Sequence, residues 1–175
     1  MVTYSTWTSE DAKAFLNGAG RKENLEESPN LYERLRYVAE ADIYAPPPAF
    51  HCFVAARDAN RLVGWCTLTE NPYKQREFWM TGIAVDVGYR NRGIAKELLD
   101  RAADVTLSSG KDLVFSSYTF FGKEFLERSI NSLTGKFPGL LVVPPDGCFG
   151  PNDRDAAEAK IMGFSHPSLS PDIDI

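Results

Sequence analysis

Apolar positions near the amino terminus of the chain recur with the period of an α-helix. Residues 8–11 have the pattern of a capping box, and the apolar residues behind them predict a short helix that ends at Gly18. Residues 28–29, a serine followed by a proline, offer a second helix start, with apolar residues at helical spacing from Leu31 onward. We expect this second helix to end before the prolines at 46–48, which cannot continue a helix.

Beyond these prolines, the pattern changes to short segments that are rich in aromatic and β-branched residues. Residues 51–57, 62–68 and 77–85 form such segments, and turn-forming residues separate them. Because the connections are short, we expect consecutive strands that pair as an antiparallel meander.

The helical period returns at about residue 91 and continues to residue 108. An apolar stripe predicts the side of this helix that faces a core, and Gly110 is in position to cap its carboxyl end. The stripe consists of Ile94, Leu98, Ala102 and Val105, whereas Lys96, Glu97, Asp100, Arg101 and Asp104 are expected to face away from it.

The remaining chain alternates between strand and helix. Residues 113–117 predict a short buried strand, and residues 121–133 predict a helix. A last strand over 140–143 and a short helix over 155–162 follow. Because a helix crosses from strand 77–85 to strand 113–117, these two strands are expected to be parallel neighbours. The pattern therefore predicts a mixed sheet with helices on its faces.

Length and charge indicate how many domains the chain forms and which kinds of partner it is expected to bind. A chain of 175 residues fits a single domain over 1–175. The formal net charge of −5, without a lysine- and arginine-rich run, disfavours a nucleic-acid partner and suits an amine acceptor better. The sequence has neither a basic leader with an apolar core nor a run of roughly 18 apolar residues. We therefore expect a soluble, cytoplasmic protein without a membrane segment.

The cysteines and histidines are too scattered for a metal site. Cys52, Cys66 and Cys148 lie far apart, as do the two histidines, and no C-x-x-C pair occurs. Since a zinc site needs clustered nitrogen and sulfur ligands, no bound metal is expected. Cys52 and Cys66 lie in apolar segments, which predicts buried, reduced thiols.

The segment from Val85 to Ala95 carries the candidate chemistry. A strand ends at Val85, a turn follows, and a helix begins near Gly93. The first N–H groups of a helix have no intrahelical acceptors and carry partial positive charge. Gly93 and Ala95 let a ligand approach the backbone closely, while Arg90 and Arg92 add fixed positive charge. The pattern predicts an anion site that suits a pyrophosphate.

The run Arg90-x-x-Gly93-x-Ala95 resembles the Q/R-x-x-G-x-G/A signature of the GNAT superfamily, which binds the pyrophosphate of acetyl-CoA. The similarity is close over residues 77–99, and the order of elements is similar from residue 2 to about residue 133. The resemblance implies an α/β (α+β) fold with a GNAT-like mixed central sheet of about six strands and helices on both faces.

The resemblance also implies where acetyl-CoA would lie. Strand 78–85 would splay from strand 113–117, and the pantetheine arm would pair with main-chain groups in the gap. One amide there would polarise the thioester carbonyl. Gly82 marks either the associated bulge or simply close packing. The implied cofactor-binding residues are Ile83, Ala84, Val85, Arg90, Asn91, Arg92, Gly93, Ile94, Ala95 and Lys96.

A base for the acceptor amine is missing from the family's usual places. The positions where a glutamate commonly falls hold Trp79 and Thr81 in this chain. Glu77 lies on the same strand face and is our candidate for the base, with Glu70 as the alternative. Two further hypotheses stay open: both glutamates are solvated hairpin charges, or Thr81 holds a water and no single residue acts as base.

The usual proton donor for the departing thiolate is also missing. Phe125 stands where the family's tyrosine is expected. Tyr118, at the end of strand 113–117, is our candidate for the general acid, and Ser116 and Ser117 are alternatives.

The last third of the chain allows a second alignment with the family. Residues 152–164 resemble the end of its fourth helix, with Ala159 in place of the tyrosine. Too few residues would then remain for two further strands, so we place that helix at 121–133.

The resemblance implies an acetyl-CoA-dependent N-acetyltransferase that acts on a primary amine of a small molecule or peptide, by direct transfer in a ternary complex. A catalytically silent acyl-CoA-binding domain, which acts as a sensor or interaction module, is the alternative. A transferase that acts on tRNA or DNA is a third reading, which the acidic charge disfavours. The sequence does not identify the acceptor, and it leaves the choice between a monomer and a homodimer open.

Overall fold

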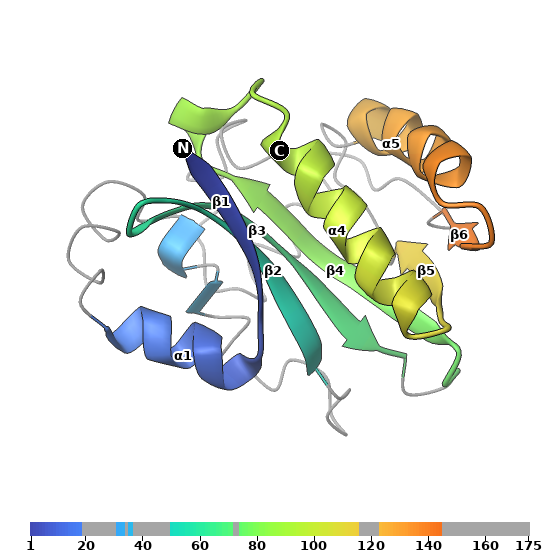
Figure 1. Cartoon of the computed structure of the whole chain (residues 1–175), viewed down its shortest axis with the longest axis horizontal. Coiled ribbons are helices and arrows are strands. Elements are labelled where there is room, and N and C mark those ends of the chain that lie inside the picture. The colour runs from blue at the N-terminus through green and yellow to red at the C-terminus, as the bar shows by residue number, and fades with distance from the viewer. Residues whose placement is uncertain (19–30, 34, 37–49, 72–73, 116–122, 145–175) are drawn as a thin grey trace, which may run out of the picture.

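The computed structural model describes residues 1–18, 31–33, 35–36, 50–71, 74–115 and 123–144. Within these residues, six strands form one sheet in the order β1-β2-β3-β4-β5-β6 (Figure 1). None of the helices described there has the length and apolar character needed to cross a membrane. The strands are β1 (Val2–Trp7), β2 (Phe50–Asp58), β3 (Arg61–Glu70), β4 (Glu77–Val85), β5 (Asp112–Phe115) and β6 (Val142–Val143). The helices are α1 (Ser9–Asn17), α4 (Ile94–Ser108) and α5 (Lys123–Lys136), with a 3₁₀ turn over Val87–Tyr89 and helical residues at 31–33 and 35–36.

The directions of the strands follow from their connections. β1 to β4 pair antiparallel in sequence order, whereas β4, β5 and β6 pair parallel. A parallel pair needs a crossover, and α4 carries the chain from the end of β4 back to the start of β5. The predicted meander, the parallel pair and the mixed sheet are thus confirmed.

Two helix ends have the geometry that the sequence predicts. At the start of α1, the Asp11 N–H donates to Thr8 Oγ1 at 3.1 Å and the Thr8 N–H donates to Asp11 Oδ2 at 2.8 Å. Just after α4, Gly110 has a φ of +66° and its N–H donates to the Leu107 carbonyl at 2.9 Å. The capping box and the glycine cap are both confirmed.

Other boundaries differ from the prediction. β1 was not predicted, because its apolar and polar residues alternate only from Val2 to Ser5 and Thr6 interrupts the pattern before Trp7. α4 begins at Ile94, not at residue 91, since Asn91 and Gly93 have φ values of 59° and 78°, which an α-helix does not accommodate. α5 continues past residue 133 to Lys136, and β6 spans only part of the predicted 140–143.

Some predictions lie outside the described residues. They concern the strand residues 116–117, the helix over 155–162 and the second alignment over 152–164. Tyr118 and Cys148 also lie outside.

Two apolar cores lie on opposite faces of the sheet, because successive residues of β2 belong alternately to one core and the other. On one face, Ile94 and Leu98 of α4 pack against the middle strands. On the other face, α1 contributes Leu16, which packs with Leu35 and the strand residue Trp65. These contacts fix the position of α4 on the sheet. They therefore also fix the position of the turn that precedes α4.

The two described cysteines are buried, free thiols, as predicted. Burial raises the pKa of the Cys52 thiol to about 11 and also raises that of Cys66. Both thiols therefore stay protonated at neutral pH and behave as small apolar core residues.

Candidate active site

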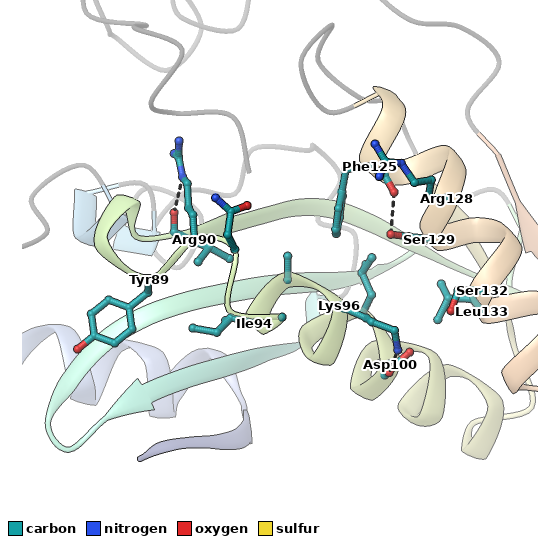
Figure 2. A pocket seen from close by; sticks show the side chains of 15 residues that line it. Tyr89, Arg90, Ile94, Lys96, Asp100, Phe125, Arg128, Ser129, Ser132 and Leu133 are labelled. Carbon is teal, nitrogen blue, oxygen red and sulfur yellow. Dashed lines mark hydrogen bonds and ion pairs between the residues drawn. The ribbon is translucent and has the colours of Figure 1, made fainter.

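A cavity of about 530 Å³ opens between the amino end of α4 and the facing side of α5 (Figure 2). It lies where β4 ends at Val85 and the chain turns into α4. The lining residues are Val85, Tyr89, Arg90, Asn91, Gly93, Ile94, Ala95, Lys96, Leu99, Asp100, Phe125, Arg128, Ser129, Ser132 and Leu133.

The amino end of α4 presents its backbone to this cavity. The Glu97 N–H donates to the Gly93 carbonyl at 3.0 Å, so the N–H groups from Gly93 to Lys96 have no acceptor within the helix. Gly93 forms no side-chain cap. Its φ is +78°, and a Cβ added there would meet no atom within 4 Å. Open N–H groups with partial positive charge at an unobstructed position are what an anion site requires.

Arg90 and Asn91 complete this side of the cavity. The Arg90 Nε donates to the Val85 carbonyl at 3.4 Å, which ties the side chain to the end of β4 (Figure 2). Asn91 adopts left-handed backbone with a φ of 59°, a conformation that asparagine tolerates better than most residues. Residues that the motif singled out as anion ligands thus meet in one cavity.

Arg92 does not line the cavity. One of its guanidinium nitrogens donates to the Gly88 carbonyl at 2.8 Å, and the guanidinium lies 4.8 Å from the centre of the Tyr89 ring. The Tyr89 hydroxyl in turn donates to Asp58 Oδ2 at 3.0 Å. These contacts tie the Arg92 side chain to the turn before α4, and its role in cofactor binding stays a prediction.

β4 and β5 pair over the first part of β4. The ladder runs from Glu77 with Asp112 to Met80 with Phe115, so residues 81–85 lie beyond the last described pair. Ile83 and Ala84 lie in this stretch, where β4 pairs with β3, and do not line the cavity, whereas Val85 does.

A bulge occurs in β4 at the start of this stretch. Thr67 of β3 pairs with Gly82 and Leu68 pairs with Met80, which leaves Thr81 without a partner in the ladder. A Cβ added to Gly82 would come within 3.0 Å of the Trp65 ring. Gly82 thus marks the bulge and a site of close packing, the two readings that the sequence left open.

The α5 side of the cavity was not recognised from the sequence. Phe125, Arg128, Ser129 and Ser132 line it, and their spacing places them on one face of a helix. The sequence pattern predicts this helix and places Phe125 where the family's tyrosine is expected, but it assigns no site role to the other three residues. An arginine and two serines beside an apolar stripe are the signal that could have identified this wall.

Comparison with models of known protein families identifies the family of this chain. Residues 19–120, more than half of the 175 residues, match the Acetyltransferase (GNAT) family. The chain belongs to the GNAT family of acetyltransferases.

Solved GNAT structures share this fold at low sequence identity. A protein of Desulfovibrio desulfuricans assigned to the GNAT family is 15% identical, with 74% of this chain and 84% of that chain covered, at a TM-score of 0.53. The GNAT family N-acetyltransferase YhbS of Escherichia coli, solved in complex with CoA, is 16% identical, with 72% and 66% covered, at a TM-score of 0.50. No curated protein matches the sequence. These likenesses concern the fold and confirm the mixed sheet with helices.

Asp100 of this GNAT protein is buried, although the sequence pattern placed it on the outer side of α4. Its side chain is 8% exposed, and its Oδ2 accepts hydrogen bonds from Lys96 Nζ at 2.9 Å and Lys136 Nζ at 2.7 Å. The pattern of one helix does not reveal which neighbour covers it, and here α5 packs beside α4. Burial alone would raise the pKa of Asp100, but the hydrogen bonds and charges of the two lysines outweigh it and lower the pKa.

We expect Asp100→Asn to lower the free energy of unfolding at pH 7 by about 1–3 kcal/mol, the range for hydrogen bonds to charged groups. Because the pKa of Asp100 is lower in the folded state, its stabilisation is present above the ordinary value of 3.8 and is lost as the pH falls. Urea unfolding of variant and wild type should therefore converge from about pH 5 downward.

Asp104→Asn is the matched control, because Asp104 is exposed on the same helix. Its effect should stay within about 0.5 kcal/mol. A loss of stability for Asp100→Asn that is independent of pH would contradict the ionic role.

Glu77 lies apart from the cavity, at the start of β4. Its carboxylate accepts hydrogen bonds from Asn71 Nδ2 at 2.7 Å and Lys74 Nζ at 3.1 Å, which close the turn before β4. Thr81 lies further along the same strand, and its hydroxyl is 2.9 Å from the hydroxyl of Thr67. The role of Glu77 as base stays a prediction, as does that of Tyr118 as acid.

Proposed function

We propose that this GNAT protein is an acetyl-CoA-dependent N-acetyltransferase that acts on a primary amine of a small molecule or peptide. The observation that carries the proposal is the open amino end of α4 beside Arg90, in a cavity of about 530 Å³. A diphosphate fits the donors present, since Gly93 leaves free space and both the N–H groups and the guanidinium can donate to phosphate oxygens. Arg90, Asn91 and the main-chain N–H groups from Gly93 to Lys96 would hold it, and Arg92 would act through the turn.

The transfer would occur directly between two bound substrates. In the ternary complex, the neutral amine nitrogen attacks the thioester carbonyl carbon, the C–N bond forms, and the C–S bond breaks to leave the CoA thiolate. Residues 83–85 lie beyond the last described pair with β5. We infer that main-chain N–H groups of Ile83, Ala84 and Val85 that point away from β3 pair with the pantetheine arm and polarise the thioester oxygen.

Two proton transfers accompany this step. The attacking amine loses a proton, which we propose passes through water to Glu77, along the strand face that also carries Trp79 and Thr81. The departing thiolate gains a proton, which we propose comes from the Tyr118 hydroxyl. Both assignments rest on the position of these residues relative to the motif in the sequence.

Release of free thiol from acetyl-CoA in the presence of an amine panel tests this function. We expect at least one primary amine to accelerate thiol release, with the acetylated amine detected by mass. Tyr118→Phe should lower kcat about 100-fold and leave the Kd for CoA unchanged, since the hydroxyl acts only when the thiolate departs. A loss of less than about threefold would exclude Tyr118 as the acid.

The same assay separates the alternative function. A protein that binds CoA but releases no thiol with any amine would be a catalytically silent acyl-CoA-binding domain. The tryptophan and threonine at the usual glutamate positions are the observation that keeps this second candidate.

A further inference from the structure

The cavity has a second cationic region, away from Arg90. Arg128 of α5 and Lys96 of α4 line the same cavity. In Figure 2, Phe125 lies between Arg90 on one side and Arg128 on the other. Two cationic regions within one cavity suit a ligand that carries two separate phosphate groups.

Lys96 is held in place by a buried partner. Its Nζ donates to Asp100 Oδ2 at 2.9 Å, and Lys136 donates to the same oxygen at 2.7 Å. The carboxylate is 8% exposed while the Lys96 side chain is 57% exposed. Two ammonium groups share one carboxylate, so this cluster carries a net positive charge, and Lys96 lines the cavity together with Arg128.

Hydroxyl groups supplement these charges. Ser129 and Ser132 lie on the face of α5 that lines the cavity. The Ser129 hydroxyl donates to the Phe125 carbonyl at 2.7 Å, so its proton is already used and it does not count as a donor to a ligand. A guanidinium, an ammonium and the Ser132 hydroxyl form a donor set suited to a terminal phosphate with two negative charges.

We propose that Arg128 and Lys96 bind the 3′-phosphate of CoA, so that the protein distinguishes CoA from dephospho-CoA. The inference rests on the proposed function, because it assumes that the diphosphate of the same ligand occupies the amino end of α4. CoA carries a phosphate monoester on its ribose in addition to the diphosphate, and dephospho-CoA lacks only this group. The pair of ligands therefore isolates the contribution of the second cationic region.

Titration calorimetry with CoA and with dephospho-CoA tests the proposal. Wild type should bind CoA about 10- to 100-fold more tightly, as expected for charged hydrogen bonds. Arg128→Gln should weaken CoA about tenfold and leave dephospho-CoA unchanged. Arg128 is exposed, so this variant is expected to fold. Lys96→Gln should likewise weaken the binding of CoA and leave the binding of dephospho-CoA unchanged.

Arg101→Gln is the matched control, because Arg101 lies on α4, pairs with Glu97 at 2.8 Å and does not line the cavity. It should leave both affinities unchanged. Equal affinity of wild type for CoA and dephospho-CoA would overturn the inference alone, as would equal losses of both ligands in Arg128→Gln. Absence of binding to either ligand at millimolar concentration would overturn the proposed function together with it.

Discussion

Gly93→Glu is expected to lower the affinity for CoA by at least about 100-fold. The residue has a φ of +78°, a left-handed conformation that costs about 1–2 kcal/mol for a residue with a Cβ. A Cβ there would meet no atom within 4 Å, so the protein offers no steric obstacle and the side chain extends into the cavity. Its carboxylate would lie beside the N–H groups that are proposed to bind the diphosphate, and its negative charge would repel the ligand. Calorimetry with CoA measures the effect.

Gly110→Glu separates the loss of the site from the backbone strain. Gly110 has a φ of +66°, also has no atom within 4 Å of an added Cβ, and lies at the other end of α4. The strain is therefore matched, and CoA affinity should remain that of wild type. If Gly93→Glu bound CoA as tightly as wild type, the amino end of α4 would not be the diphosphate site.

Leu98→Ala is expected to destabilise the fold by about 2–5 kcal/mol. Leu98 is 0% exposed in the core between α4 and the sheet. Gly64 of β3 lets the helix approach closely, because a Cβ there would lie 3.3 Å from Leu98 Cδ1. With strand and helix this close, we expect little room for neighbours to fill the cavity that the truncation leaves. Urea unfolding at neutral pH gives the difference in free energy.

Leu107→Ala removes the same atoms from a position on α4 that is 36% exposed. Its loss should be smaller by at least about 1.5 kcal/mol, since little apolar surface is returned to water. Similar losses for the two leucines would mean that α4 is not seated on the sheet as described.

Local chemistry made much of the fold predictable. The capping box of Thr8 and Asp11, the left-handed Gly110 and the strand over 77–85 depend on residues close in sequence, and all have the expected geometry. The predictions that failed concerned segments whose local sequence pattern is irregular. In β1, Thr6 follows Ser5 and interrupts the alternation of the strand, and α4 begins after Asn91 because of the left-handed backbone at Asn91 and Gly93.

The site was only partly predictable, because the sequence pattern reveals contacts between residues that are close in sequence and not those that depend on the fold. Arg90, Gly93 and Ala95 line the cavity as the motif suggests, because a turn between a strand and a helix brings them together locally. The motif could not distinguish Arg90 from Arg92. Arg92 is drawn away by Gly88 and Tyr89, whose positions depend on the folded turn.

The sequence by itself determined that a strand, a turn and a helix with an open amino end follow one another, since periodicity and backbone preference act over a few residues. Only the tertiary structure decided what faces that helix end. Asp100 pairs with Lys136, 36 positions away, and Arg128 of another helix lines the cavity. Such contacts depend on how two helices pack on the sheet, and no pattern within either helix specifies which of its faces meets the other.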